Sequence, residues 1–447
     1  MLLSAMGAAG VRAQAPVLSA GSGPEPLQEA AWRADLQQLR QEFLARDRAY
    51  SPQARAQAEA RLALLEAQQG PLPWLRLAID VAQIAALADN GHTAASATPR
   101  VARCHRVPIR LAPFGADWHV LRAREADADL LGGRLLAIDG VGTGALRRAA
   151  HSLVGGTAAW RDRQAPFLFE CPPQLQTMGL AREAESALYL FESADGRLIE
   201  RRLVGEAPHA ERIRASTERL LLPQVNAGLQ GWLSALPLER APWSLRDAEQ
   251  RMRWRHAAEL NALVIDLRVN TDTATQKLRG FFDEIEAAAN ELKPAHLVLD
   301  LRQNGGGDLT RTRAFAQSLP ALAKGRLFVL TSPWTFSAAI STAAYAKQAA
   351  PQRVTLVGEA AGDRLQFFAE GRPLTLKHSG LVLLPATERH DYRDGCRSFQ
   401  DCHGSVIRHP IAIATLEPDI AAPWTCAAWR EGSDPAMEAV ASALKTA

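Results

Sequence analysis

The chain has 447 residues, of which 47% are hydrophobic and 22% are charged, and its formal net charge at pH 7 is +3. This composition is typical of a globular protein with two or three domains and a sizeable buried core. Lys and Arg are interleaved with Asp and Glu along the chain, which argues against a nucleic-acid-binding protein. No apolar run reaches the roughly 18 residues needed to cross a bilayer, so we expect no stable membrane span.

Residues 1–24 contain a short apolar segment that ends in Ala13-Gln14-Ala15, a pattern similar to the cleavage site of a secretory signal. The segment has no basic residues before its apolar part, and Pro16 follows the cleavage position directly. Two interpretations stay open: an incomplete or mis-started signal peptide, or a disordered Ala/Gly tail. The first predicts a periplasmic or secreted protein.

Helical periodicity dominates residues 25–98, which we predict to form an N-terminal helical domain. The stretch P-W-L-R-L-A-I-D-V-A-Q-I-A-A-L-A repeats apolar residues at three- and four-residue spacing. The pattern ends at D-N-G-H-T, residues 89–93, where turn-forming residues place His92 in a loop.

A β-rich module is predicted for residues 99–205, where short apolar runs are punctuated by Gly and Asp. Within it, D-L-L-G-G-R-L-L-A-I-D-G is similar to the middle of PDZ-like domains, which bind extended peptides by strand addition. Residues 206–245 are predicted to be a linker region.

Residues 246–447 alternate continuous apolar strands with helices, as expected for a buried sheet covered by helices. The sequence therefore predicts an α/β fold in the broad sense, an α+β multidomain protein with an α/β core at its C-terminal end.

Five cysteines are too few for a disulfide scaffold, and no C-x-x-C pair indicates zinc or redox chemistry. Cys396 and Cys402 enclose a short loop and are the pair that we expect to be bridged if the protein is exported. Reduced, partly buried cysteines are the alternative.

The most informative stretch is H-L-V-L-D-L-R-Q-N-G-G-G-D, residues 296–308. A buried strand ends at Asp300 and Arg302, and three glycines follow. Successive N–H groups in such a loop can form an anion-binding concavity, but the pattern lacks the G-K-[ST] of a P-loop and the spacing of a dinucleotide fold. The other use of such N–H groups is an oxyanion hole for acyl transfer.

A hydroxyl-rich turn, T-S-P-W-T-F-S-A-A-I-S-T, follows one helix and one strand later, at residues 331–342. Ser337 lies at a predicted strand-to-helix turn, where its hydroxyl could act as a nucleophile. The alternative is that Thr335 or Ser337 is only the N-cap of the helix, the commonest task of a hydroxyl at that position.

Together, D-L-R-x-N-G-G-G, the T-x-S-A turn and V-T-L-V-G-E resemble the tail-specific (C-terminal-processing) serine peptidase family, which includes tricorn-core relatives. The resemblance covers roughly residues 75–445. It implies a crotonase- or ClpP-like catalytic core, a PDZ-like module and a serine endopeptidase that acts on peptides or unfolded proteins through an acyl-enzyme. It also implies Ser337 as the nucleophile, with the N–H groups of Gly307 and Ala338 forming the oxyanion hole.

The base is predicted from the same resemblance. One branch of the family carries a lysine shortly after V-G-E, but residues 357–364 of this chain contain none. The tricorn-core-like branch uses a histidine ahead of the PDZ-like segment, and His92 is in the matching place, although Gly91 replaces the polar residue that precedes it there. Glu388 is the nearest candidate for the glutamate that completes that set, followed by Asp391 and Asp394.

A second function stays open: a catalytically inactive protein of the same fold that binds peptides or small hydrophobic ligands. We expect no cofactor. The histidines at positions 390, 403 and 409 lie in a Cys- and Asp-rich loop, but their spacing matches no tight zinc pattern, so no metal site is predicted either.

Overall fold

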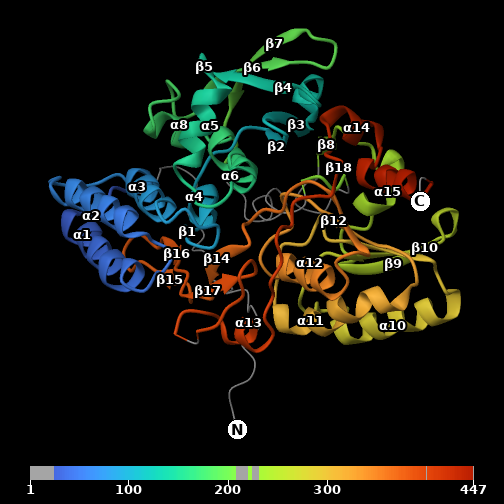
Figure 1. Ribbon diagram of the computed structural model, residues 1–447. Coiled ribbons are helices and arrows are strands. Elements are labelled where there is room, and N and C mark those ends of the chain that lie inside the picture. The colour runs from blue at the N-terminus through green and yellow to red at the C-terminus, as the bar shows by residue number, and fades with distance from the viewer. Residues whose placement is uncertain (1–24, 208–219, 224–230, 399, 446–447) are drawn as a thin grey trace.

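A computed structural model describes residues 25–207, 220–223, 231–398 and 400–445. The signal-like segment at Ala13-Gln14-Ala15 lies outside these residues. The predicted fold class is confirmed, because helices and sheets alternate in several packed units (Figure 1). Within the described ranges, no helix is long and apolar enough to cross a membrane.

Helices dominate the N-terminal part, as the periodicity predicts. Four helical segments follow one another: α1 (Glu29–Gln38), the π-helix η1 (Leu39–Leu44), α2 (Pro52–Glu66) and α3 (Trp74–Ala86). Helix α2 begins where Ser51 accepts a hydrogen bond from the N–H of Ala54 and Pro52 takes the first position. Trp32, Leu36 and Leu77 are fully buried in the core between these helices.

A seven-stranded antiparallel sheet follows, with strand order β2-β3-β4-β6-β7, β5 paired to β4 and β8 paired to β3. Its strands are β2 (Ile109–Phe114), β3 (Asp117–Arg124), β4 (Arg134–Ile138), β5 (Val141–Gly142), β6 (Ser186–Glu192), β7 (Leu198–Val204) and β8 (Trp232–Ser234). Strand β8 comes from residues 206–245, so this part of the predicted linker is instead a sheet strand. We call this sheet and its helices the seven-stranded module.

Short helices accompany this sheet: α4 (Ala97–Ala102), η2 (Glu125–Leu130), α5 (Thr143–His151), α6 (Ala158–Gln164), α7 (Pro166–Phe169) and α8 (Pro172–Thr177). Helices α5 and α6 lie beside the sheet in Figure 1. Helix α6 begins where the Thr157 hydroxyl accepts a hydrogen bond from the N–H of Trp160.

The C-terminal part is built on a six-stranded sheet with strand order β18-β13-β12-β11-β10-β9. Its strands are β9 (Met252–Ala257), β10 (Ala262–Leu267), β11 (His296–Asp300), β12 (Leu327–Thr331), β13 (Val354–Gly358) and β18 (Ile420–Ala421). Strand β9 is antiparallel to β10, and the other pairs are parallel. All residues of β10 and β12 are buried, as their continuous apolar sequences predict.

Helices cover both faces of this sheet, which explains its apolar strands. On one face lie α10 (Leu278–Leu292), α11 (Leu309–Ser318) and α12 (Ala338–Ala349). On the other face lies the C-terminal helix α15 (Pro435–Lys445). Alternate residues of a strand therefore face different cores: Leu297 and Leu299 pack toward α10 and α11, whereas Val298 packs toward α15.

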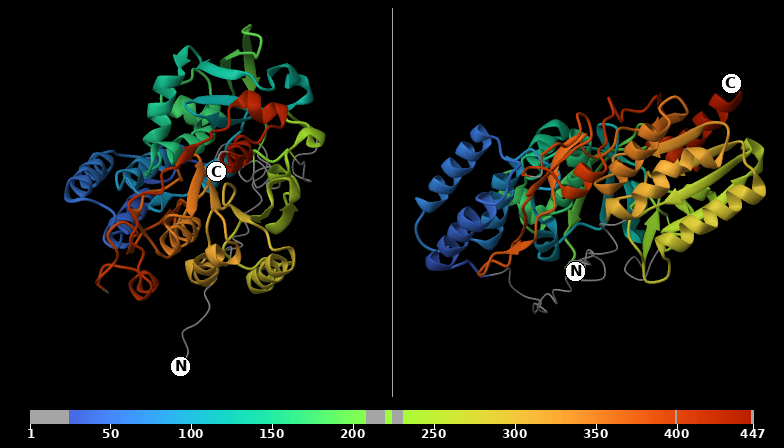
Figure 2. Two further views of the ribbon diagram at one scale, coloured as in Figure 1. Left: turned by 45° about the vertical axis from the view of Figure 1, so that its right-hand side comes forward. Right: turned by 60° about the horizontal axis from the view of Figure 1, so that its bottom comes forward.

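Short strands after β13 connect this core to the N-terminal helices. They are β14 (Gln366–Ala369) paired with β17 (Glu388–Asp391), and β15 (Leu374–Thr375) paired with β16 (Val382–Leu384), which also pairs with β1 (Ala94–Ala95). Helices α13 (Gly404–Arg408) and α14 (Cys426–Glu431) follow. Figure 2 shows the N-terminal helices and the six-stranded core at opposite ends of the molecule, with these segments between them. The carboxyl ends of β11, β12 and β13 face the same way and carry the loops described next.

Candidate active site

Ser337 lies in the turn between β12 and α12, as the sequence predicts. Its backbone has φ 56° and ψ −127°, a combination that non-glycine residues rarely adopt and that stores strain. Its side chain makes no capping hydrogen bond, and its hydroxyl has no hydrogen-bond partner among the described residues. The turn therefore presents this hydroxyl instead of using it for structure.

The other five hydroxyls of the turn are engaged. They donate hydrogen bonds of 2.7–3.0 Å to main-chain carbonyls: Thr331 to Glu359, Ser332 to Arg302, Thr335 to Leu301, and both Ser341 and Thr342 to Ala338. The N-cap alternative is therefore wrong, because the Thr335 hydroxyl is bonded elsewhere and Ser337 caps nothing.

The glycine loop passes directly against the serine. Gly306 and Gly307 have positive φ values of 104° and 139°. A Cβ at Gly306 would lie 2.7 Å from Cβ of Ser337, so only glycine allows this approach. The N–H of Gly306 is already bonded to Asn304, whereas the N–H groups of Gly307 and Ala338 donate to no main-chain carbonyl in the described loops.

Two buried asparagines tie the glycine loop to the serine turn. The Asn304 side chain accepts the N–H of Gly306 and donates to the side chain of Asn270, both at 2.8 Å, and the Asn304 carbonyl accepts the N–H of Phe336 at 3.0 Å. Asn270 donates to the carbonyl of Ala338 at 2.9 Å. Neither asparagine is singled out by the sequence interpretation, although Asn304 belongs to the D-L-R-x-N-G pattern.

His92 reaches the same turn from the N-terminal part of the chain. Its ring is stacked between Phe336, at 4.5 Å between centroids, and Phe367, at 5.0 Å. Phe336 immediately precedes Ser337. The loop is held by Asn90, whose side chain donates to the carbonyl of Phe368 at 2.9 Å and accepts its N–H at 3.1 Å. The predicted histidine and serine are therefore brought to neighbouring positions.

The carboxylate beside His92 differs from the one predicted. Asp363 Oδ2 lies 3.2 Å from Nδ1 of His92, and the Asp363 side chain is only 1% exposed. This contact is an approach of two groups and not a formed hydrogen bond, because both ring nitrogens of His92 and Oδ2 of Asp363 have no hydrogen-bond partner among the described residues. Glu388 instead begins β17 opposite Ala369 and makes no ion pair with His92 there. Asp363 lies in the stretch after V-G-E that contains no lysine. An acidic residue in that stretch is the feature of the sequence that could have indicated a partner for His92.

The glycine before His92 has a steric reason. A Cβ at Gly91 would lie 3.0 Å from the Phe336 ring and 3.3 Å from Oδ2 of Asp363. A Cβ at Gly156 would in turn meet Cα of Gly91 at 3.0 Å. Because position 91 is packed from two sides, the polar residue that the sequence interpretation finds missing has no space here.

Six rings from six segments form one continuous stack through His92. The centroid distances are 4.0 Å from Trp160 to Phe336, 4.5 Å to His92, 5.0 Å to Phe367, 4.8 Å to His390 and 5.1 Å to His403. Aromatic pairs in such stacked arrangements stabilise their contacts beyond simple burial. The stack fixes the plane of the His92 ring.

Asp300 and Arg302, at the end of β11, have a structural role. Arg302 forms ion pairs of 2.7 Å with Asp300 and 2.6 Å with Asp434, which precedes α15. Burial raises the pKa of Asp434, but Arg302 outweighs this effect and holds that pKa below its usual value. The D-L-R part of the motif therefore anchors the C-terminal helix beneath the site.

Four of the five cysteines are paired. Cys396 is joined to Cys402, the pair that the sequence favours, and Cys104 is joined to Cys171 across 67 residues. Cys426 is buried and free. Among the described residues, no group of three His, Cys, Asp or Glu side chains is placed to hold a metal ion.

Comparisons with known proteins extend this description. No family profile and no curated protein matches the sequence. Among solved structures, mature CPAF complexed with lactacystin is 13% identical, with 93% of this chain and 98% of that chain covered and a TM-score of 0.57. A second structure of mature CPAF is 13% identical, with 93% and 97% covered and a TM-score of 0.55. The photosystem II D1 C-terminal processing protease is 13% identical over 93% and 96%, with a TM-score of 0.40. The chain therefore has the fold of mature CPAF over nearly its full length.

Proposed function

We propose that this protein is a serine endopeptidase of the tail-specific class, with Ser337 as its nucleophile. The observation that carries the proposal is the strained Ser337, whose hydroxyl is unused and which follows a residue stacked on a carboxylate-paired histidine. A nucleophile, a base and a group that orients the base are the parts that acyl transfer requires.

In the proposed reaction, Oγ of Ser337 attacks the carbonyl carbon of a peptide bond while Nε2 of His92 takes the hydroxyl proton. The N–H groups of Gly307 and Ala338 donate hydrogen bonds to the oxyanion. When the C–N bond breaks, His92 returns the proton to the leaving amine. Water then attacks the acyl-enzyme with His92 again as base, which releases the second product and restores Ser337.

Asp363 would act as a positioning residue in this reaction. Oδ2 of Asp363 lies 3.2 Å from Nδ1, and a hydrogen bond formed between them during the reaction would hold the proton on Nδ1 and leave Nε2 as the basic nitrogen. The lack of a lysine in residues 357–364 and the place of His92 support placing the chain nearer to the tricorn-core-like branch. The fold shared with mature CPAF supports the peptidase proposal at the level of architecture.

We also propose that the seven-stranded module is PDZ-like and presents the peptide to this site, and that the protein is periplasmic or secreted. The two disulfides support export, because such bonds persist mainly in oxidising compartments.

The second candidate, an inactive binding protein of the same fold, is favoured by one observation: neither ring nitrogen of His92 has a hydrogen-bond partner among the described residues. Hydrogen bonds of this kind are often loose in ligand-free sites. Chemical labelling separates the two functions.

The test is labelling with a fluorophosphonate probe, which reacts with activated serines. We expect the wild-type protein and Ser193→Ala, a variant of a serine on an exposed turn, to be labelled alike. Ser337→Ala should not be labelled. If the wild-type protein is not labelled, or if Ser337→Ala still is, the endopeptidase proposal fails and the binding protein is favoured.

A further inference from the structure

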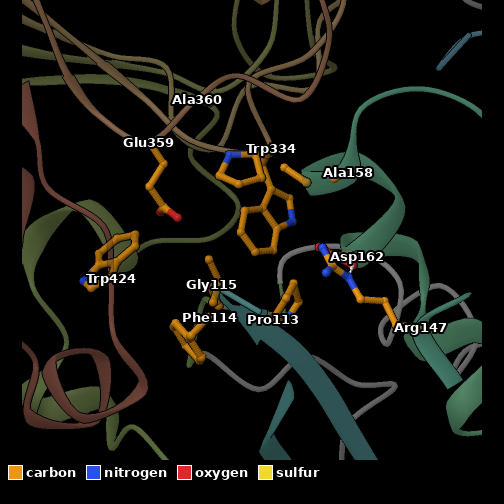
Figure 3. Close-up of a pocket in the computed structure, with 13 residues that line it drawn as sticks. Pro113, Phe114, Gly115, Arg147, Ala158, Asp162, Trp334, Glu359, Ala360 and Trp424 are labelled. Atoms are coloured by element: carbon orange, nitrogen blue, oxygen red, sulfur yellow. Dashed lines mark hydrogen bonds and ion pairs between the residues drawn. The ribbon is translucent and has the colours of Figure 1, made fainter. Parts of the chain in front are cut away.

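A cavity of about 300 Å³ lies between the seven-stranded module and the loops that follow β12 and β13 (Figure 3). Phe114, at the end of β2, belongs to the wall from the module. The opposite wall contains Trp334, Glu359 and Trp424. Trp334 lies in the same turn as Ser337, so one short segment carries both the nucleophile and part of this wall.

Glu359 supplies a carboxylate to the interior of the cavity. It directly follows β13, and Figure 3 shows its side chain reaching into the space between the rings of Trp334 and Trp424. Within the described residues, no Lys, Arg or His forms an ion pair with it. Burial raises the pKa of Glu359 to about 7, against the smaller opposing effects of the main-chain N–H of Trp424, which donates to its carboxylate, and of Arg302.

The other charged side chains that line the cavity, Arg147 and Asp162, balance each other. Arg163 lies outside the lining, forms no ion pair among the described residues, and places its guanidinium carbon 5.5 Å from the centroid of the Trp334 ring. Arg302 pairs with Asp300 and Asp434. Arg147, on the module side, donates to both oxygens of Asp162 at 2.7 and 2.6 Å. His151 also contacts Asp162, at 2.6 Å. Glu359 is therefore the charge that a ligand in the cavity would have to neutralise.

The aromatic walls of the cavity also favour a cationic ligand. Cations are attracted to the faces of Trp and Phe rings, and this attraction grows when water is excluded. The cavity offers the rings of Trp334, Trp424 and Phe114 around Glu359, the one carboxylate of its lining without an ion pair among the described residues. Arg163 already lies 5.5 Å from the centroid of the Trp334 ring and Arg302 4.8 Å from that of Trp424, so a ligand cation would use the other face of each ring. An anionic ligand would be repelled by Glu359, and an apolar one would leave its charge unpaired.

We propose that this cavity binds an alkylammonium group of the peptide substrate, either a lysine side chain or the N-terminal amine. Its role as a substrate subsite rests on the proposed function, whereas the binding itself rests on the cavity. Because the ammonium group would pair with ionised Glu359, binding is strongest above the pKa of about 7 and weakens as that carboxylate becomes protonated at lower pH.

The experiment uses the full chain as the Ser337→Ala variant, so that binding is measured without catalysis. Three probes are compared by titration calorimetry at pH 8: N-acetyl-lysine methylamide, norleucine methylamide with a free α-amine, and N-acetyl-norleucine methylamide with neither amine. We expect at least one amine to bind roughly tenfold more tightly than the neutral probe, as a charge-assisted contact would provide. The amine that is preferred identifies the source of the ammonium group.

Glu359→Gln should abolish the preference, because glutamine keeps the size and the acceptor for the main-chain N–H of Trp424 but not the charge. Glu417→Gln, at an exposed position, should retain it. In the Ser337→Ala background with native Glu359, the preference should fall when the titration is repeated at pH 6. The proposal is overturned if the three probes bind alike at pH 8, if none binds, or if Glu359→Gln keeps the preference. If the protein is not labelled by the fluorophosphonate but still binds the amine, the peptidase proposal fails and the proposed binding of ammonium groups stands.

Discussion

Ser337 and His92 are held in the candidate site by different kinds of contact. The serine turn is fixed by hydrogen bonds within the C-terminal core: Asn304 and Asn270 link it to the glycine loop, and its other hydroxyls bond to nearby carbonyls. His92 comes from the N-terminal part and is held by two stacked rings and one carboxylate contact of 3.2 Å.

The two kinds of contact meet two different structural requirements. A backbone strained at Ser337 needs many directional bonds around it, since each offsets part of the strain. A base that must move protons needs a fixed ring plane and a free Nε2, and stacking fixes the plane without occupying that nitrogen. Substitutions around Ser337 should therefore mainly lower the stability of the protein, whereas substitutions around His92 should mainly lower the reaction rate.

The largest expected effect is on the base. His92→Phe keeps a ring in the stack but removes the nitrogen, so we expect the rate of fluorophosphonate labelling to fall about 10⁴-fold or more. His390→Phe, two rings further along the same stack, is the matched control and should lose less than about tenfold. Equal losses in both variants would mean that packing, and not a proton acceptor, is what His92 contributes.

The next effect concerns the carboxylate. Asp363→Asn keeps the shape but no longer fixes the proton on Nδ1, and we expect a fall of about 10² to 10⁴ in the labelling rate. Glu388→Gln should change it by less than about threefold, because Glu388 makes no ion pair with His92 in the described structure. With a peptide substrate, the loss in Asp363→Asn should lie in kcat and leave KM nearly unchanged. A larger effect in Glu388→Gln than in Asp363→Asn would show that Glu388, the residue predicted from the sequence, is the carboxylate that assists His92.

On the nucleophile side, Asn304→Ala removes three side-chain hydrogen bonds in a fully buried position. Because buried partners are left unsatisfied, we expect the free energy of unfolding to fall by about 3 kcal/mol, measured by urea denaturation. Asn290→Ala, on the exposed face of α10, should change it by less than about 0.5 kcal/mol. Similar values for the two variants would show that the asparagine network does not hold the turn.

The same contrast explains what could be predicted from the sequence. Ser337, Gly307 and Ala338 belong to contiguous patterns at the ends of predicted strands, and the order of strands and helices was readable from periodicity. Their local geometry follows from a few neighbouring residues. The fold class was predictable for the same reason, because the buried strands β10 to β13 are continuous apolar runs.

The partner of His92 was not readable in this way. Asp363, Phe336 and Phe367 meet His92 only after the short strands between the two parts of the molecule have paired. Glu388 is the candidate that the family resemblance implies, but its place in the chain does not reveal that its strand register sets it opposite Ala369. Cys104 and Cys171, 67 residues apart, were missed for the same reason.

The smallest effect tests how closely the base loop is packed. Gly91→Ala adds a Cβ about 3.0 Å from the Phe336 ring, so the ring or the loop must shift. Because His92 is the next residue, the shift moves its nitrogens relative to Ser337, and we expect the labelling rate to fall about tenfold with a loss of about 1–2 kcal/mol in stability. Gly280→Ala in helix α10, where an added Cβ meets no atom within 4 Å, should instead raise stability slightly.

If Gly91→Ala were labelled at the wild-type rate, the His92 loop would have more freedom than its stack implies. His92 would then approach Ser337 through movement of its loop and would not be held in one position. A merely destabilised protein would lose labelling only in proportion to its folded fraction. If the labelling rate of Gly91→Ala falls by a larger factor than its folded fraction does, the loss comes from the changed position of the His92 ring.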